Sequence, residues 1–295
     1  MVKLKPECIK CLFNKYSQKV PNDAPEALVT EYLKRLSLIL YEAPLTDSAP
    51  LIVERINKLQ KELFGIEDDY TDVKRYFNKL MMSKAESVKL SIKASNEPLR
   101  MALKYAMLGN YIDFGMLCGV DTAALEKMLE DADSLTVSDT ELALLRKDLA
   151  AAKRLTFITD NCGEIVLDKL LIGQIAKEYD HLDVTVMVRG KPVLNDATMD
   201  DAREVGLCDE YLVVDNGNGV AGTCFERISI EAREVLDGSD VIIAKGQANF
   251  ETMRGCGKNV YYVFLCKCKM FSDQFGVEQY SGMMLNDIRT YGTQI

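Results

Sequence analysis

The feature that most constrains the fold of this chain is a change in hydrophobic periodicity near Arg154. After this residue, short runs rich in β-branched and aromatic side chains alternate with segments whose apolar residues recur every three or four positions. This alternation predicts βαβ units and a mostly parallel sheet with helices on both faces, which is the α/β class. Ligands of such sheets bind beyond the carboxyl ends of the strands. The polar residues that follow each strand are therefore the candidate site residues.

The residues before Arg154 show the helical period instead. From Pro21 to about Ala152, apolar residues recur at helical spacing, and no strand-like alternation interrupts them. We therefore expect an all-helical domain over residues 1–152 and an α/β domain over residues 153–295.

Charge and apolar content limit the partners of the chain. Of its 295 residues 48% are hydrophobic, and its net charge is −9 with no long basic run. Nucleic acid is not an expected partner, because phosphate backbones are bound by clustered lysine and arginine. No apolar run approaches the roughly 20 residues of a membrane span, and the N-terminus lacks the pattern of a secretory signal. We expect a cytoplasmic protein that does not associate with membranes.

The first predicted strand ends in Thr-Asp-Asn-Cys-Gly-Glu, which contains Asp160, Asn161 and Glu164. An aspartate and an asparagine at a strand end offer hard oxygen ligands, which suit Mg²⁺ or Mn²⁺ better than zinc. The alternative is that Asp160 or Asn161 only caps the next helix, and for this segment alone the cap is the more frequent arrangement.

The second predicted strand is followed by Arg189, Lys191 and Asp196. Asp196 is a candidate third metal ligand, and the two cations are candidates for contact with a phosphate group. The alternatives are again a helix cap for Asp196 and a solvated surface charge for Lys191. The metal-ligand interpretation of Asp196 is favoured because Asp196 is the second acidic residue at successive strand ends.

A later strand, Val-Ile-Ile-Ala, runs into Lys245 and Gly246, with Gln247 and Asn249 next. A lysine beside a glycine and amide side chains is typical of a loop that holds phosphate through a point charge and backbone N–H donors. The spacing matches neither the P-loop nor the dinucleotide-binding glycine pattern.

Two close cysteine pairs, Cys8 with Cys11 and Cys266 with Cys268, lie near opposite ends of the chain. A zinc or redox role for them stays open beside the alternative of buried thiols. His181 is the only histidine, so a Ser-His-Asp or Cys-His mechanism has little to work with. Acid–base chemistry is left to carboxylates, lysines or a metal ion.

Several segments in order along the chain resemble the damage-control phosphatase family, also known as an acidic-residue methyltransferase-like domain. They are TDNCGE, GKPVLNDATMDDAREVGL, GTCFE, SDVIIAKGQANFE and FLCKCK, with NEPLRMALKYAMLGNYIDFG and CIKC in the helical half. The cysteine pairs are similar to those of its largely prokaryotic branch. The resemblance implies a helical N-terminal domain on a Rossmann-like three-layer α/β/α domain.

The resemblance also implies an activity, which is metal-dependent hydrolysis of phosphate monoesters of small metabolites, such as sugar phosphates or damaged phosphometabolites. Mn²⁺, Co²⁺ or Ni²⁺ is the expected cofactor, with Mg²⁺ as an alternative. The implied metal ligands are Asp160, Asn161 and Asp196. The residues expected to act in catalysis or to contact substrate are Glu164, Lys245, Asn110, Asp113, Arg189, Lys191, Gln247, Asn249 and Lys267. A carboxylate methyltransferase and a non-catalytic phosphometabolite-binding protein are the alternatives.

Overall fold

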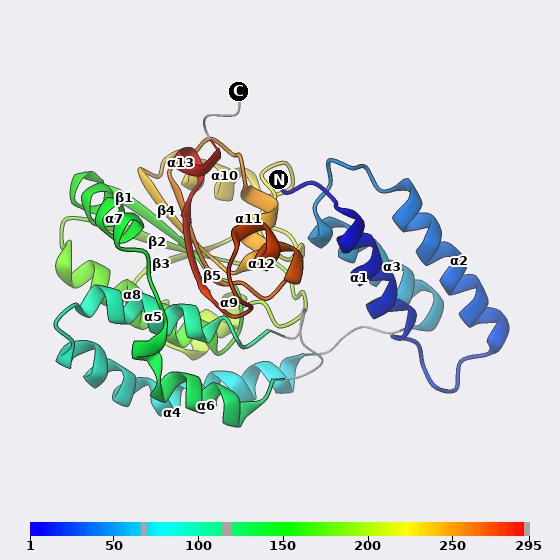
Figure 1. The fold of residues 1–295 in the computed structure, drawn as a ribbon, viewed down its shortest axis with the longest axis horizontal. Helices are drawn as coiled ribbons and strands as arrows, with labels where there is room; N and C mark the ends of the chain where they lie inside the picture. Colours follow the sequence, from blue (N-terminus) through cyan, green and yellow to red (C-terminus); the bar gives the residue numbers. More distant parts are fainter. Residues whose placement is uncertain (66–69, 114–119, 292–295) are drawn as a thin grey trace.

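A computed structural model describes residues 1–65, 70–113 and 120–291, and its central element is a six-stranded sheet with helices on both faces (Figure 1). The strands are β1 (Arg154–Ile158), β2 (Asp183–Val188), β3 (Leu212–Asp215), β4 (Val241–Lys245), β5 (Val260–Leu265) and β6 (Gly282–Asn286). Their order across the sheet is β3-β2-β1-β4-β5-β6. Strands β1 to β5 are parallel and β6 runs antiparallel to β5. The predicted α/β class with a mostly parallel sheet is confirmed.

One strand, β6, was not predicted from the sequence. The structure places β6 on the outer edge of the sheet. Its sequence, Gly-Met-Met-Leu-Asn, has no β-branched or aromatic residue, so its strand character comes from pairing with β5 and not from local propensity.

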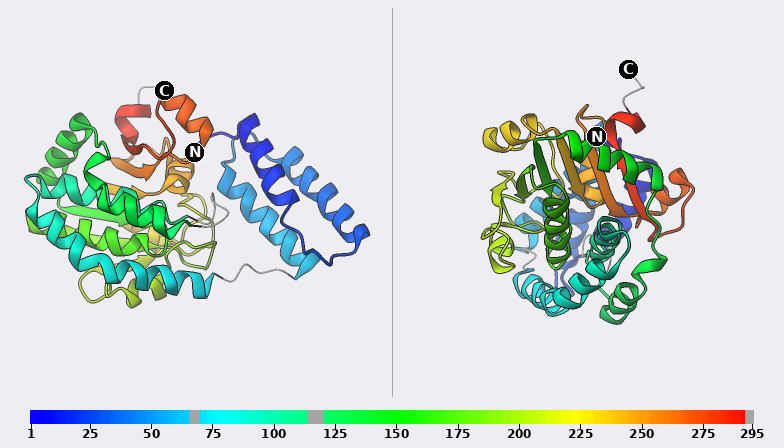
Figure 2. Two further views of the ribbon diagram at one scale, coloured as in Figure 1. Left: turned by 60° about the horizontal axis from the view of Figure 1, so that its bottom comes forward. Right: turned by 90° about the vertical axis from the view of Figure 1, so that its left-hand side faces the viewer.

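The pleat of the strands divides the buried apolar residues between the two faces. Leu155 and Phe157 of β1 belong to a large cluster with the helices of one face, whereas Ile242 and Ala244 of β4 belong to the cluster of the other face. The first face is covered by α4 (Thr71–Ala94), α5 (Pro98–Gly109), α7 (Asp139–Ala151) and α8 (Glu164–Glu178), and the second by α10 (Ile230–Asp237), α11 (Gln247–Met253) and α12 (Lys269–Phe275) (Figure 2). This gives the three-layer arrangement that the resemblance implied. The remaining helical segments are α6 (Thr122–Glu130), η1 (Ala132–Ser134), α9 (Met199–Glu204) and α13 (Asp287–Tyr291).

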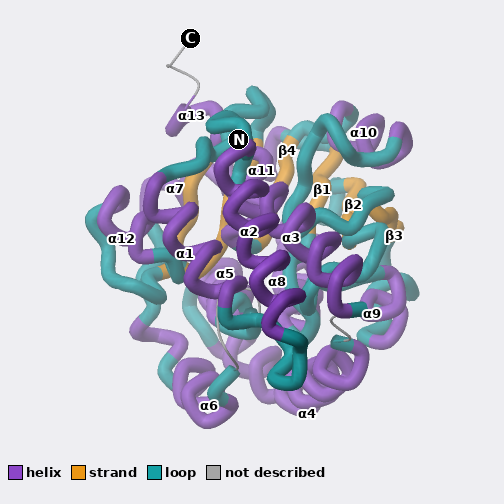
Figure 3. Tube along the Cα trace, turned by 90° about the vertical axis from the view of Figure 1, so that its right-hand side faces the viewer, coloured by secondary structure: helices purple, strands orange, loops and turns teal. Residues whose placement is uncertain are grey.

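Three helices at the start of the chain form a separate group, called here the N-terminal helical lobe. They are α1 (Pro6–Ser17), α2 (Glu26–Glu42) and α3 (Ala49–Phe64) (Figure 3). Their buried apolar side chains form a cluster of their own. The backbone N–H of Val2 donates to the Glu251 carbonyl at 2.7 Å, which ties the start of the chain to α11. Helices α4 to α7, in contrast, share their buried cluster with the sheet. Residue 152 lies where the helices give way to the first strand. Its role as a boundary between two domains stays a prediction.

None of the helices in the described ranges is long and apolar enough to cross a membrane. The order of the strands reverses between β1 and β4, so the connections leave these two strands in opposite directions. A crevice at the carboxyl end of the sheet is expected at this position in doubly wound folds. The candidate site residues lie there.

Candidate active site

Strands β1 and β4 bring Asp160 and Gly246 into close approach at the switch point. Gly246 has a φ of +81°, and a Cβ atom built on it would lie 1.9 Å from Oδ2 of Asp160. A side chain at this position would collide with the carboxylate and strain the backbone. Gly246 therefore leaves the space beside the β4 backbone that the Asp160 carboxylate occupies.

The three predicted metal ligands lie side by side in the structure. Asn161 and Asp196 form an isolated antiparallel bridge, and the Ala197 N–H donates to the Asp160 carbonyl at 2.7 Å. Backbone pairing thus holds the segment after β2 against the segment after β1. Asp160, Asn161 and Asp196 are 5%, 2% and 3% exposed. A nearly dry site strengthens electrostatic interactions between such groups.

Hydrogen bonds fix which atom of the Asn161 amide is available to a ligand. Its Nδ2 donates to Asp160 Oδ2 at 2.8 Å and to Glu164 Oε2 at 2.9 Å. Asn110, at the end of α5, donates to the same two oxygens at 3.0 Å each. Both carboxyl oxygens accept these bonds, so they fix the orientation of each amide with its nitrogen toward them. The Asn161 Oδ1 is left on the opposite side of the amide, as a neutral oxygen available to a ligand.

Lys245 was predicted to bind phosphate, but its ammonium is bound by groups of the protein. Its ammonium is fully buried and donates to Glu164 Oε1 at 2.6 Å, to Asp168 Oδ1 at 2.6 Å and to the Ala106 carbonyl at 2.8 Å. An ammonium has three donors, and all three are used. The prediction that Lys245 grips phosphate directly is therefore not supported by this arrangement. The lysine instead neutralises Glu164, which in turn orients Asn161.

Arg189 is also buried, although it was predicted to meet substrate. Its Nε donates to Asp196 Oδ2 at 2.6 Å, and its Nη2 lies 3.6 Å from Asp160 Oδ1 and 3.3 Å from Asn249 Oδ1. With a side chain that is 0% exposed, this guanidinium faces the two acidic ligands and not open space. Arg189 therefore holds the two carboxylates of the site, and its contact with substrate stays a prediction.

Asn249 has a structural position as well. Its Nδ2 donates to the Lys245 carbonyl at 2.6 Å and the Thr159 carbonyl at 3.1 Å, which joins the ends of β1 and β4. Its Oδ1 accepts from Thr223 Oγ1 at 2.9 Å. Contact between Asn249 and substrate stays a prediction.

The remaining predicted substrate residues fall into two places. Lys267, after β5, pairs with Asp113 at 2.5 Å, and Gln247 accepts from the Cys268 N–H at 3.3 Å. Both residues lie at the carboxyl end of the sheet. Lys191 is exposed and lines a separate cavity. The structure therefore brings Lys267 near the acidic cluster and leaves Lys191 outside it.

A family model of the damage-control phosphatase ARMT1-like domain matches residues 4–283. The chain belongs to this family. A damage-control phosphatase from Archaeoglobus fulgidus is 30% identical over 291 residues, which cover 94% of this chain and 96% of that protein. One from Pyrococcus horikoshii is 28% identical over 272 residues, or 90% of this chain and 92% of that protein. The crystal structure of a DUF89 family protein from Pyrococcus horikoshii aligns with a TM-score of 0.79 and 25% identity, covering 97% of this chain and 100% of that one. The family predicted from the sequence is confirmed.

The charges at the site of this family member leave room for a divalent cation. Five carboxylates, from Asp113, Asp160, Glu164, Asp168 and Asp196, face three cations, from Arg189, Lys245 and Lys267, so five negative less three positive charges leave a formal charge of −2. Burial and the neighbouring Asp196 and Glu164 raise the pKa of Asp160 well above its ordinary value. Both observations fit a site that binds a cation.

Few side chains at the site can serve as metal ligands. Among the described residues, no three His, Cys, Asp or Glu side chains converge in a way that would hold a metal ion. The candidate centre therefore has two carboxylates, and it needs the Asn161 amide and non-protein oxygens to complete a shell, as is common for Mg²⁺. The cysteine pairs form no such centre within the described ranges either. Metal binding itself stays a prediction.

Asp168 is a site residue that the sequence analysis missed. It lies in the first half of α8, fully buried, and its Oδ2 has no hydrogen-bond partner. Its signal in the sequence is a carboxylate inside the apolar run Ile-Val-Leu-Asp-Lys-Leu-Leu, on the face of α8 that packs against the sheet. A buried acid needs a partner, and here it is Lys245. Thr223, in the GTCFE segment, was not predicted as a site residue either, and it donates to Asn249 Oδ1.

The burial of Asp168 predicts how stability varies with pH. Burial raises the pKa of this carboxyl to about 7, although Lys245 opposes the shift. A folded-state pKa above the unfolded value of about 3.9 gives stability that is complete below pH 4 and lost as pH rises through about 7. Asp168→Asn should therefore flatten the fall in the free energy of unfolding between pH 5 and pH 8, measured by urea titration.

Asp148→Asn is the matched control for this measurement. Burial opposes the shift, but hydrogen bonds from Tyr261, Asn259 and Arg289 lower the pKa of Asp148. Its stabilising contribution is therefore lost as pH falls, and not as it rises. An Asp168→Asn protein whose slope equals that of the wild type would contradict the assignment of the titrating group.

Proposed function

We propose that this chain is a divalent-metal-dependent phosphomonoesterase that hydrolyses small phosphorylated metabolites, such as sugar phosphates or damaged phosphometabolites. The observation that carries the proposal is the convergence of Asp160, Asn161 and Asp196 at the switch point of a family member. The names of the Archaeoglobus and Pyrococcus relatives support the reaction class. The overall reaction consumes one water and yields an alcohol and inorganic phosphate.

Asp160, Asp196 and the Oδ1 of Asn161 are the groups that would hold the metal ion. Their oxygen chemistry suits Mn²⁺ or Mg²⁺, and Co²⁺ or Ni²⁺ are further candidates. When bound, such an ion supplies positive charge against the phosphoryl oxygens and acidifies water beside it. Arg189 contributes by holding the Asp196 carboxylate through its Nε. Glu164 contributes by accepting both an Asn110 and an Asn161 amide proton.

Lys267 is the residue best suited to bind the phosphoryl group. Its ammonium pairs with Asp113, whose side chain is 14% exposed, whereas the ammonium of Lys245 has no donor left. A phosphoryl oxygen that accepts from Lys267 Nζ would take the place of the Asp113 carboxylate, so one charge-assisted bond would replace another. Positive charge placed in this way stabilises the charge that develops during phosphoryl transfer.

Asp113 is better placed than Glu164 for proton transfer. Both Glu164 oxygens are engaged, one by Lys245 and the other by two amides, so this carboxylate is held as an acceptor. When the Lys267 ammonium binds the phosphoryl group of the substrate, it releases Asp113 Oδ2. This oxygen would then take a proton from the attacking water, or return it to the leaving alcohol oxygen. Groups in this role typically contribute about 10² to 10⁴ in rate.

Removal and return of metal tests the proposal. The protein is stripped with a chelator and assayed with p-nitrophenyl phosphate and with sugar phosphates, before and after addition of Mn²⁺, Co²⁺, Ni²⁺ or Mg²⁺. We expect no phosphate release from the stripped protein and recovery with at least one of these ions. Release at full rate without metal, or no release under any of these conditions, would refute the proposal.

A further inference from the structure

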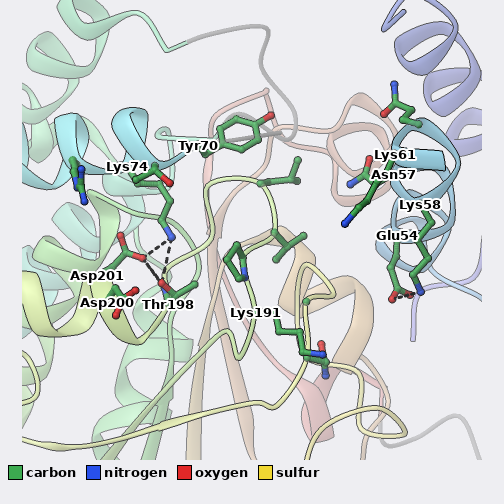
Figure 4. Close-up of a pocket in the computed structure, with 18 of the residues that line it drawn as sticks. Glu54, Asn57, Lys58, Lys61, Tyr70, Lys74, Lys191, Thr198, Asp200 and Asp201 are labelled. Atoms are coloured by element: carbon green, nitrogen blue, oxygen red, sulfur yellow. Dashed lines mark hydrogen bonds and ion pairs between the residues drawn. The ribbon is translucent and has the colours of Figure 1, made fainter. Parts of the chain in front are cut away.

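A cavity of about 1090 Å³ lies between the N-terminal helical lobe and the loops at the carboxyl end of the sheet. Helix α3 supplies Lys58 and Lys61 to one wall, and the first turn of α4 supplies Lys74 to the opposite wall. Lys191, from the loop after β2, lies between the two walls (Figure 4). This volume greatly exceeds the space of one phosphoryl group and is in the range of sites for small organic ligands.

The cavity borders the candidate active site. Its wall includes Leu194 and Thr198, which flank Asp196 in the sequence. Thr198 forms a parallel bridge with Arg189, and Arg189 holds the Asp196 carboxylate. The short loop from Leu194 to Thr198 thus contributes residues both to the cavity wall and, through Asp196, to the acidic cluster. A ligand whose phosphoryl group reaches Asp196 has this cavity beside it for the rest of the molecule.

Each carboxylate in the cavity wall already has a partner. Lys58 bonds Glu54 at 2.9 Å, and Lys74 bonds Asp201 at 2.6 Å. Asp200 and Glu204 are bound by Arg203 at 3.0 Å and by the Asn78 amide at 2.8 Å.

Two cations of the wall remain available. Within the described part of the chain, Arg75 and Lys191 form no ion pair, and both are exposed. The described wall has one more cation than carboxylates, so its formal charge is +1 in a protein whose net charge is −9: the cations are Lys58, Lys61, Lys74, Arg75 and Lys191, and the carboxylates are Glu54, Asp200, Asp201 and Glu204.

We propose that this cavity receives the end of the substrate remote from the ester and recognises a second anionic group there, with Lys191 and Arg75 as its specificity-determining residues. This inference rests on the proposed phosphatase function and adds a substrate class to it: phosphate monoesters that also carry a carboxylate or a second phosphate. Electrostatic complementarity of this kind gives selectivity between otherwise similar ligands. Lys191, predicted to contact the transferred phosphate, acts in this proposal on the other end of the molecule.

Competition by two matched compounds tests the inference. 6-Phosphogluconate and glucitol 6-phosphate share one carbon chain and differ by a carboxylate in place of a hydroxymethyl group. Each is used as a competitive inhibitor of p-nitrophenyl phosphate hydrolysis by the metal-loaded protein at fixed free metal, so that binding is measured with or without turnover. We expect the inhibition constant of 6-phosphogluconate to be lower by about tenfold at low ionic strength, because exposed charges are then poorly screened.

Charge reversal locates the effect. Lys191→Glu should reduce the preference for 6-phosphogluconate about fivefold, and the double variant with Arg75→Glu should abolish it. Lys191→Arg should keep it. Lys177→Glu, an exposed lysine at the far end of α8, is the control and should not change it. About 0.5 M KCl should also weaken the preference in the wild type, which a purely structural role would not predict.

Three results would overturn the inference. They are equal inhibition by the two compounds, inhibition by neither, and an unchanged preference in the double variant. Hydrolysis of p-nitrophenyl phosphate in the same assay shows separately whether the phosphatase proposal holds. Failure of that hydrolysis with every metal would remove both proposals, whereas hydrolysis without the preference would remove only this one.

Discussion

Replacing Asp160 by asparagine is expected to lower kcat/KM by a thousandfold or more, roughly the effect of losing several kcal/mol of charge stabilisation at 1.36 kcal/mol per decade. The substitution keeps the size of the side chain beside Gly246, so the close approach at the switch point is retained. It removes one negative charge from a cluster whose formal charge is −2. The metal affinity of the stripped protein, measured by calorimetry with Mn²⁺, should fall together with the activity.

The control for this substitution is Asp215→Asn, which changes another aspartate at a strand end. Asp215 ends β3, is exposed, and accepts from the Gly217 N–H at 2.8 Å, a bond that an asparagine oxygen also accepts. Metal affinity and kcat/KM of this variant should stay within about twofold of the wild type, as for most surface substitutions. An Asp160→Asn enzyme that retains wild-type turnover would remove Asp160 from the metal centre.

The part of the fold that could be predicted is the part fixed by periodicity. The runs that became β1, β2, β4 and β5 are apolar and short, and the helices between them enforce parallel pairing. The strand β6 was missed because its stability depends on an edge of β5, which lies elsewhere in the chain. The separate core of the N-terminal helical lobe was also not predictable, since the helical period of α1–α3 resembles that of α4–α7.

That Asp160 and Asp196 lie close together could be predicted from topology, whereas the face of the sheet toward which the Lys245 side chain points depends on the pleat of β4. Parallel strands end at one edge, so Asp160 and Asp196 had to be neighbours. Lys245 follows Val241 and Ile243 at a spacing of two, and these residues belong to the cluster under α5 and α8. The same alternation directs Lys245 into that layer, toward Asp168. The sequence contained this information, but the strand boundary needed to apply it was uncertain until the structure placed it.

Lys245→Met is the second substitution with a large expected effect, and it acts mainly on stability. Removing one partner from a buried ion pair costs about 3–5 kcal/mol, because the remaining charges are left without compensation. Here two carboxylates, Glu164 and Asp168, would lose their shared cation in a fully buried site. The expected free energy of unfolding at pH 7.5, measured by urea titration, is lower by that amount. The loss is a large fraction of the stability of a typical protein, which is about 5–15 kcal/mol.

The pH dependence and a second substitution separate this explanation from a simple loss of packing. Lys245 is the group that opposes the raised pKa of Asp168, so without it the folded state holds the Asp168 proton to a higher pH. Stability gained from a raised pKa is lost as pH rises, and the defect of Lys245→Met should therefore shrink between pH 8 and pH 5. Adding Asp168→Asn, which removes one of the unpaired charges, should recover part of the loss.

Lys169→Met, which removes a half-buried lysine of α8 paired with Glu210, is the control and should cost about 1 kcal/mol with little pH dependence. A defect in Lys245→Met that is constant over this pH range and unaffected by Asp168→Asn would show that the lysine contributes only volume.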